Sequence, residues 1–167
     1  MKEEIELMPS HLEVTTPSER EIRVARTFDA PAELVFECHT KPEYLKKWLL
    51  GPPGWSMPTC DVDLTVGGRY RYVWRNDAGA GEFGVQGEFR EIDRPQRIVH
   101  TESMDGIPGE ALCTTTFEES GSNTRFTLTM LFESQEARDV ALESGMTEGM
   151  SMSYDRMQDL IGKERAS

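Results

Sequence analysis

The side chains best suited to acid–base chemistry in this sequence are His100 and Glu102, which stand two positions apart in the segment RIVHTES. Residues at i and i+2 of a strand project from the same face, so Ile98, His100 and Glu102 share one face of the predicted strand. An imidazole and a carboxylate on one face could act together as a general acid–base couple. The alternative is that His100 is a hydrogen-bonded or exposed strand histidine without a catalytic role. Both interpretations stay open on the sequence alone.

Other kinds of reactive centre find little support in the residue pattern. The three histidines are His11, His39 and His100, whereas a metal centre needs several ligands that converge at short range. Cys38 and His39 are adjacent on a predicted helix and point apart, and His100 stands alone on its strand, so we expect no metal site. The chain has no GxSxG elbow, no CxxC motif and no phosphate-cradling loop, so we expect no cofactor.

Aromatic and methionine side chains form a second group of candidates. Tyr70, Tyr72 and Trp74 alternate with other residues, so their rings share one strand face. Four methionines fall between residues 146 and 157 of the predicted final helix. Such residues commonly fill a core, but they also line pockets for flat apolar ligands, and phenols there supply hydrogen bonds. The pocket residues that we predict are Trp48, Tyr70, Tyr72, Trp74, His100, Met130, Met150, Tyr154 and Met157.

A strand and two short helices come first among the elements that must position these side chains. The alternation of residues 21–28 predicts a strand with a largely apolar face, and residues 11–16 form a possible short strand before it. The next segment predicts two helices, the first capped by Asp29 or Ala30. The second begins with a capping box at Thr40, and Gly-Pro-Pro ends it.

Further strand patterns and two helices fill the rest of the chain. Gly67-Gly68 predicts a bulge or sharp bend within the strand-like segment CDVDLTVGGRYRYVW. A short helix capped by Ser134 follows the last strand, and one long amphipathic helix closes the chain. Short turns make neighbouring strands antiparallel. This order predicts an α+β fold in which a curved antiparallel sheet of six to seven strands wraps around the long C-terminal helix, with two short helices after the first strand.

Composition narrows the function classes and the environment. The 167 residues predict one domain over 1–167, with a mobile acidic leader at 1–10. A net charge of −12 argues against nucleic acid or an anionic membrane as partner, because phosphate contacts need clustered Lys and Arg. Three irregularly spaced cysteines favour reduced thiols, and no apolar leader or bilayer-length segment is apparent. We therefore expect a cytoplasmic protein.

Five segments carry a recognisable series of motifs: residues 28–37, 40–52, 61–72, 87–103 and 143–161. Together and in this order they resemble the SRPBCC superfamily of START-like, helix-grip folds, specifically the Activator of Hsp90 ATPase homologue 1-like domain. Members often carry paired tryptophans where this chain has Trp48-Leu49, which changes the shape of the aromatic side-chain group at that point.

The resemblance implies a deep cavity between the curved sheet and the terminal helix, often suited to a hydrophobic small molecule. It does not imply one reaction, since the superfamily includes lipid carriers, hormone receptors, cyclases and hydroxylase domains. Our leading hypothesis is binding of a hydrophobic or aromatic small molecule without chemistry. One alternative is a cyclase- or hydrolase-like enzyme that uses His100, Glu102 or a tyrosine. The other is an Hsp90-associated interaction module. A homodimer through a sheet edge is compatible with such a domain.

Overall fold

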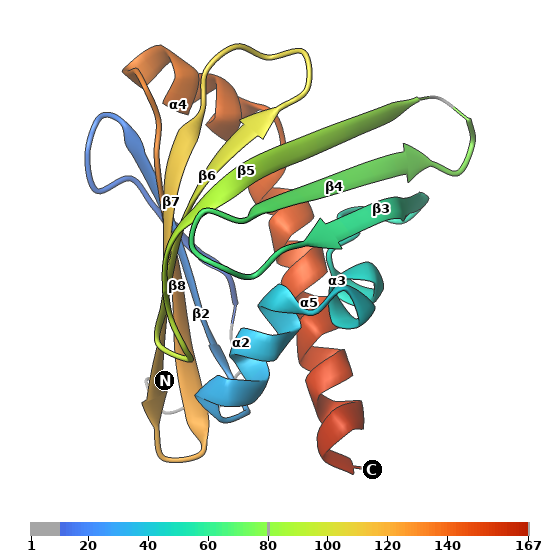
Figure 1. Cartoon of the computed structure of the whole chain (residues 1–167), viewed down its shortest axis with the longest axis vertical. Coiled ribbons are helices and arrows are strands. Elements are labelled where there is room, and N and C mark those ends of the chain that lie inside the picture. Colours follow the sequence, from blue (N-terminus) through green and yellow to red (C-terminus); the bar gives the residue numbers. More distant parts are fainter. Residues whose placement is uncertain (1–10, 80, 167) are drawn as a thin grey trace, which may run out of the picture.

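The fold is a curved antiparallel sheet wrapped around a long C-terminal helix, α5 (Met146–Ala166) (Figure 1). This computed structural model describes residues 11–79 and 81–166, so the expected leader at 1–10 lies outside the described residues. The sheet has eight strands in the order β1-β2-β8-β7-β6-β5-β4-β3. The predicted α+β helix-grip class is therefore confirmed, although the sheet has more strands than the six to seven expected.

One half of the sheet is built from strands that are far apart in the sequence. The second strand covers the residues that alternation predicted, and Ile22, Val24 and Phe28 on its inner face are fully buried. It pairs on one side with a short N-terminal strand and on the other with the last strand of the chain. These elements are β1 (Glu13–Thr15), β2 (Glu21–Phe28), β7 (Ala111–Ser120) and β8 (Asn123–Leu131).

The other half contains the one clear error in the predicted strand pattern. Of the two alternatives predicted at Gly67-Gly68, the bulge is wrong. The chain bends so sharply that it reverses, which divides the expected long strand into two and gives the eighth strand. Gly67 has φ +86°, a conformation that favours glycine, and a side chain on Gly68 would lie 2.3 Å from the Asp63 carbonyl. These strands are β3 (Trp55–Val62), β4 (Arg69–Asn76), β5 (Glu82–Asp93) and β6 (Arg97–Met104).

The first of the two short helices, α2 (Ala32–Thr40), begins where it was expected but with a different cap. Pro31 occupies the N-cap position and makes no side-chain cap hydrogen bond, so the predicted cap by Asp29 or Ala30 is wrong. Instead, a carboxylate oxygen of Glu119 on β7 accepts from the backbone N–H of the first helical residue at 2.8 Å. A contact distant in sequence therefore replaces the local cap.

The second short helix, α3 (Pro42–Trp48), also lacks the predicted capping box. Its N-cap is Lys41, whose side chain makes no cap hydrogen bond. Thr40 is the last residue of α2, and its hydroxyl donates to the Phe36 carbonyl at 3.0 Å instead of bonding into α3. The preceding helix therefore extends to the residue that the sequence pattern assigned to the cap.

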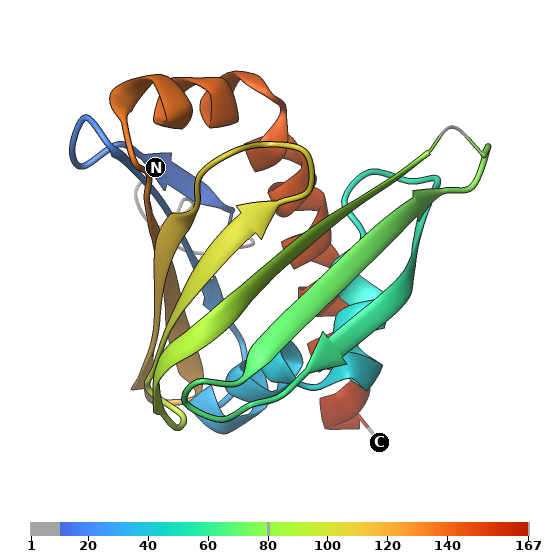
Figure 2. The same cartoon turned by 45° about the horizontal axis from the view of Figure 1, so that its top comes forward.

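The C-terminal pair of helices follows the prediction closely. The hydroxyl of Ser134 accepts from the backbone N–H of Ala137 at 3.0 Å, so the predicted N-cap of α4 (Gln135–Glu143) is confirmed. Gly145, with φ +85°, separates α4 from α5. The two views show α4 at one end of the sheet and α5 along its concave side, with α2 and α3 beside the lower half of α5 (Figures 1 and 2).

Candidate functional site

A cavity of about 600 Å³ lies on the concave side of the sheet, against α5. The inner faces of the strands form one wall, and the segment 48–55 together with the first half of α5 forms the other. Every tryptophan of the chain lines it: Trp48, Trp55 and Trp74. Aromatic, aliphatic and methionine side chains make up most of the remaining surface, which is the composition expected of a small-molecule pocket.

Eight of the nine residues that the sequence placed in a pocket line this cavity. The exception is Met157, which is fully buried in the core and is not part of the lining. It lies on α5 one turn beyond Ser153 and Tyr154, where the cavity ends. The eight lining residues are Trp48, Tyr70, Tyr72, Trp74, His100, Met130, Met150 and Tyr154.

The side chain of Tyr70 extends across the neighbouring strand, β5, and forms a hydrogen bond with the strand beyond it. Tyr70 on β4 is paired with Gly87 on β5, and its hydroxyl donates to the Thr101 carbonyl on β6 at 2.7 Å. The absence of a side chain on Gly87 makes room for this ring, because a Cβ there would lie 2.7 Å from Tyr70 Cε1. Glycine in a strand interior commonly marks such a close approach.

The aromatic rings of the wall are in mutual contact. The ring centroid of Tyr70 lies 5.0 Å from that of Tyr72 and 5.2 Å from that of His100, and Tyr72 lies 6.0 Å from Trp74. The indole Nε1 of Trp74 donates to the Leu49 carbonyl at 2.7 Å, which ties β4 to the segment after α3. The wall is therefore a continuous aromatic surface, and the indole N–H of Trp74 is not free to bond a ligand because it already donates to a backbone carbonyl.

A polar cluster interrupts this apolar surface. His100, Glu102 and Cys113 each offer a ligand atom, and these atoms lie within 4.8 Å of one another. His100 and Cys113 are directly paired across β6 and β7, and Glu102 lies two residues further along the same face. The expectation that His100 stands alone on its strand is therefore wrong, because only the strand pairing brings Cys113 to it.

Burial governs the protonation of this cluster. Desolvation lowers the pKa of His100 to about 4, so its imidazole is neutral near pH 7. The same cause raises the pKa of the Glu102 carboxyl and holds the pKa of the Cys113 thiol well above its ordinary value. The three donor types suit zinc, but a metal would have to displace protons that burial favours on Glu102 and Cys113. The expectation of no metal site stays a prediction.

His39 is a cavity residue that the sequence reasoning missed. Its Nδ1 lies 2.8 Å from the Val35 carbonyl, and its ring stacks on Phe126 with centroids 4.9 Å apart. Desolvation lowers its pKa to about 4. Position 39 is four residues after the apolar Val35, which is buried on α2, so helical spacing offered the signal.

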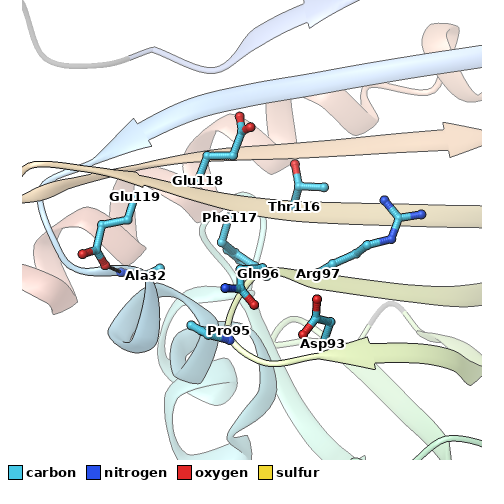
Figure 3. Close-up of a pocket in the computed structure, with 9 residues that line it drawn as sticks. All are labelled: Ala32, Asp93, Pro95, Gln96, Arg97, Thr116, Phe117, Glu118 and Glu119. Atoms are coloured by element: carbon cyan, nitrogen blue, oxygen red, sulfur yellow. Dashed lines mark hydrogen bonds between the residues drawn. The ribbon is translucent and has the colours of Figure 1, made fainter.

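A second pocket of about 620 Å³ lies outside the cavity, at the turn between β5 and β6 and the start of α2 (Figure 3). Most of its lining residues are polar or charged, and two of the charged ones have partners within the protein. Glu119 bonds the start of α2, as the dashed line in Figure 3 shows, and Arg97 pairs with Glu91 at 3.0 Å. The inner cavity is therefore the better candidate for a functional site.

The fold and cavity define the class of the protein, a helix-grip domain in which a curved sheet encloses a long helix. Residues 29–162 match the family model described as "Activator of Hsp90 ATPase homolog 1-like protein". The chain therefore belongs to the Activator of Hsp90 ATPase homolog 1-like family, as its sequence motifs indicated. A search of curated proteins gives no match. Among the described residues, no helix combines the length and apolar character needed to cross a membrane.

Solved structures with the same fold come from several organisms. A Rhodobacter sphaeroides protein is 26% identical, with a TM-score of 0.86 over 92% of this chain and 99% of that one. A Nitrosomonas europaea protein is 26% identical, with a TM-score of 0.79 over 90% and 99% of the two chains. A Plasmodium falciparum protein described as an Hsp90 activator is 17% identical, with a TM-score of 0.57 over 86% and 96%, and shows the likeness of the fold alone.

Proposed function

We propose that this protein binds a hydrophobic or aromatic small molecule in the cavity between the sheet and α5. The observation that carries this proposal is a cavity of about 600 Å³ whose surface is mainly aromatic, aliphatic and methionine side chains. A cavity of this size falls within the range of roughly 300–1,000 Å³ typical of small-molecule sites. The physiological ligand is not assigned by this proposal.

The hydrophobic effect supplies the driving force for such binding. Each Å² of apolar surface removed from water contributes about 25 cal/mol, so a two-ring aromatic compound gains several kcal/mol on entry. The rings of Tyr72 and Trp74 present faces and edges that favour offset or edge-on contact with a flat ligand. His100 and Glu102 are the polar groups that can orient the ligand.

Titration with N-phenyl-1-naphthylamine, a neutral apolar fluorophore, tests the proposal directly. Bound probe in this cavity is close to Trp48, Trp55 and Trp74, so it should quench tryptophan emission while its own emission rises and shifts to the blue. We also expect a higher melting temperature at saturating probe, because binding to the folded state alone stabilises it. Absence of all three signals would reject the proposal.

Two matched substitutions on α5 locate the binding site. Met150 lines the cavity, whereas Met152 is 43% exposed and does not. Met150→Trp should occupy cavity volume and weaken probe binding at least tenfold, and Met152→Trp should change it less than twofold. Probe emission is excited directly so that the added indole does not disturb the reading. Equal effects of the two variants would place the probe elsewhere.

An enzyme of the cyclase or hydrolase kind is the second candidate, and one observation favours it. His100 and Glu102 both line the cavity, as an acid–base couple must. His100→Ala should then abolish turnover of a substrate while probe binding persists. The likeness to the Plasmodium Hsp90 activator concerns the fold alone, so it adds no support for an Hsp90 partner.

A further inference from the structure

We propose that the cavity selects ligands that carry a protonated amine on an apolar or aromatic body, and that the Glu102 carboxylate is the counter-ion. This inference rests on the proposed function and names the chemical class of its ligand. Three observations support it: the charges of the residues that line the cavity, the lack of a bonding partner for Glu102, and the aromatic rings in the lining.

The described lining contains one acidic residue and neither Lys nor Arg. Glu102 is the sole Asp or Glu among the described residues that surround the cavity. A ligand carboxylate or phosphate would enter without a counter-ion and would lie near a carboxylate, which is costly away from water. Fatty-acid-like anions are therefore disfavoured, and neutral or cationic ligands remain.

Glu102 has no partner within the described part of the protein. No described backbone or side-chain donor bonds its carboxylate, and no described Lys or Arg forms an ion pair with it, so desolvation is the cause that shifts its pKa. Acidic residues on the outside behave differently: Asp105 pairs with Arg71 at 2.7 Å and Glu82 pairs with Arg75 at 2.6 Å. A buried carboxylate normally has a hydrogen-bond donor or a cation beside it. We therefore expect the ligand to supply the cation that binds this carboxylate.

Three tyrosine rings line the same cavity as this carboxylate. The charge of Glu102 contributes to the raised pKa values of the Tyr70, Tyr72 and Tyr154 phenols, so it acts on rings from both β4 and α5. The negative faces of such rings attract an ammonium group, and the attraction strengthens when water is excluded. A cavity lined by one carboxylate and three phenol rings is a suitable environment for an amine.

Burial raises the pKa of the Glu102 carboxyl, but an ammonium ion beside it favours the ionised form and lowers that pKa again. The titratable groups near Glu102 carry no charge that would oppose this. His39 from α2 and His100 from β6 are neutral near pH 7, because burial lowers both pKa values to about 4. The Cys113 thiol from β7 stays protonated, and so do the three phenols, whose pKa values are all raised. None of these groups supplies a positive charge that would compete with an ammonium ion. A net charge of −12 also attracts cations toward the surface.

Three probes with the same naphthalene body separate the effect of charge from that of shape: 1-naphthylmethylamine, 1-naphthalenemethanol and 1-naphthoate. Affinities are measured by calorimetry at pH 7.5 with EDTA present, so that trace metal does not occupy the His100, Glu102 and Cys113 cluster. We expect the amine to bind at least tenfold more tightly than the alcohol, and the carboxylate to bind most weakly. The wild-type comparison alone can overturn the inference.

Substitution of Glu102 tests whether this residue causes the preference for the amine over the alcohol. Glu102→Gln keeps the shape and removes the charge, so it should weaken amine binding at least tenfold and leave alcohol binding within about twofold. Glu102→Asp should retain the preference for the amine. Glu19→Gln removes the same charge from an exposed position outside the cavity and should have no effect.

The possible results distinguish the inference from the proposed function. If the alcohol binds as well as the amine, or if Glu102→Gln keeps the preference for the amine, the inference is wrong while the cavity remains a binding site. Tightest binding of the carboxylate overturns it as well. If none of the three probes binds and the neutral fluorophore also fails, the proposed function and the inference fall together.

Discussion

The indole Nε1 of Trp48 donates a 2.7 Å hydrogen bond to the backbone carbonyl of Cys38. Continuation of α2 would satisfy this carbonyl with the N–H of residue 42, but Pro42 has no N–H. The side chain at the end of α3 therefore supplies the donor that is missing at the end of α2. Trp48 therefore lines the cavity and also joins the two short helices through its hydrogen bond.

Trp48→Phe should lower the free energy of unfolding by about 1–3 kcal/mol, because it leaves a buried carbonyl without a donor. Urea unfolding followed by circular dichroism measures the change. Trp55→Phe is the matched control, since Trp55 also lines the cavity but its indole has no hydrogen bond to a described residue. A loss of the same size in both variants would contradict the role assigned to the hydrogen bond.

Gly87→Ala should destabilise the sheet strongly. The new Cβ would lie 1.8 Å from the Thr101 carbonyl oxygen, which belongs to backbone and cannot rotate away. We expect a loss of at least about 3 kcal/mol, or failure to fold, because overpacking of this kind moves whole strands. Gly162→Ala is the control, since nothing lies within 4 Å of its Cβ on α5, and it should stabilise by up to about 1 kcal/mol. Thermal unfolding of the two variants compares them.

Acid should destabilise the protein through its two buried histidines. Burial lowers the pKa values of His39 and His100 from 6.5 to about 4, so between these pH values the unfolded chain binds more protons than the folded chain. Stability is therefore present above pH 6.5 and is lost as the pH falls toward 4, by up to about 3 kcal/mol for each histidine. Glu102 opposes this trend, because its pKa is raised.

A pH series of urea unfolding curves measures this loss. His100→Gln should flatten the dependence on pH between 6.5 and 4, because one of the two titrating groups is removed. His11→Gln replaces an exposed histidine and should leave the curve unchanged. An unchanged slope in His100→Gln would show that His100 is not buried in its neutral form.

All three cysteines should resist alkylation in the folded protein. Burial is the main cause that raises the pKa of Cys38 to about 12 and that of Cys60 to about 11, and it holds the pKa of Cys113 well above its ordinary value. The thiolate is the reactive form, so iodoacetamide at pH 8 should react slowly, and fastest at Cys60. Mass spectrometry should find all three modified after unfolding in urea. Rapid modification of Cys113 would contradict the closed packing of β7.

Local patterns predicted the elements that depend on local chemistry. Strand alternation gave the bounds of β2, and the hydroxyl of Ser134 caps α4 as expected. The helix caps at Asp29 and Thr40 were wrong because distant or preceding structure takes their place: Glu119 caps α2, and α2 itself extends through Thr40. The two glycines at 67 and 68 signalled a break, but alternation alone cannot distinguish a bulge from a reversal of the chain.

The sequence indicated the apolar part of the candidate site together with His100 and Glu102, but it did not indicate that Cys113 and His39 join them. Alternation located the aromatic wall, because Tyr70, Tyr72 and Trp74 are close in sequence. The approach of Cys113 to His100 depends on the register between β6 and β7, which no local pattern contains. His39 lies on a helix and His100 on a strand, so only the packing of the helix against the sheet shows that both line one cavity.

The position of β6 in the middle of the sheet has a consequence for how this protein can change. Because β6 pairs with β5 on one side and β7 on the other, the backbone that carries His100 and Glu102 is fixed by two hydrogen-bonded ladders. The segment 48–55 and the first turns of α5, on the opposite wall, lie outside those ladders. Substitutions in the opposite wall can therefore change the shape of the cavity while His100 and Glu102 keep their positions.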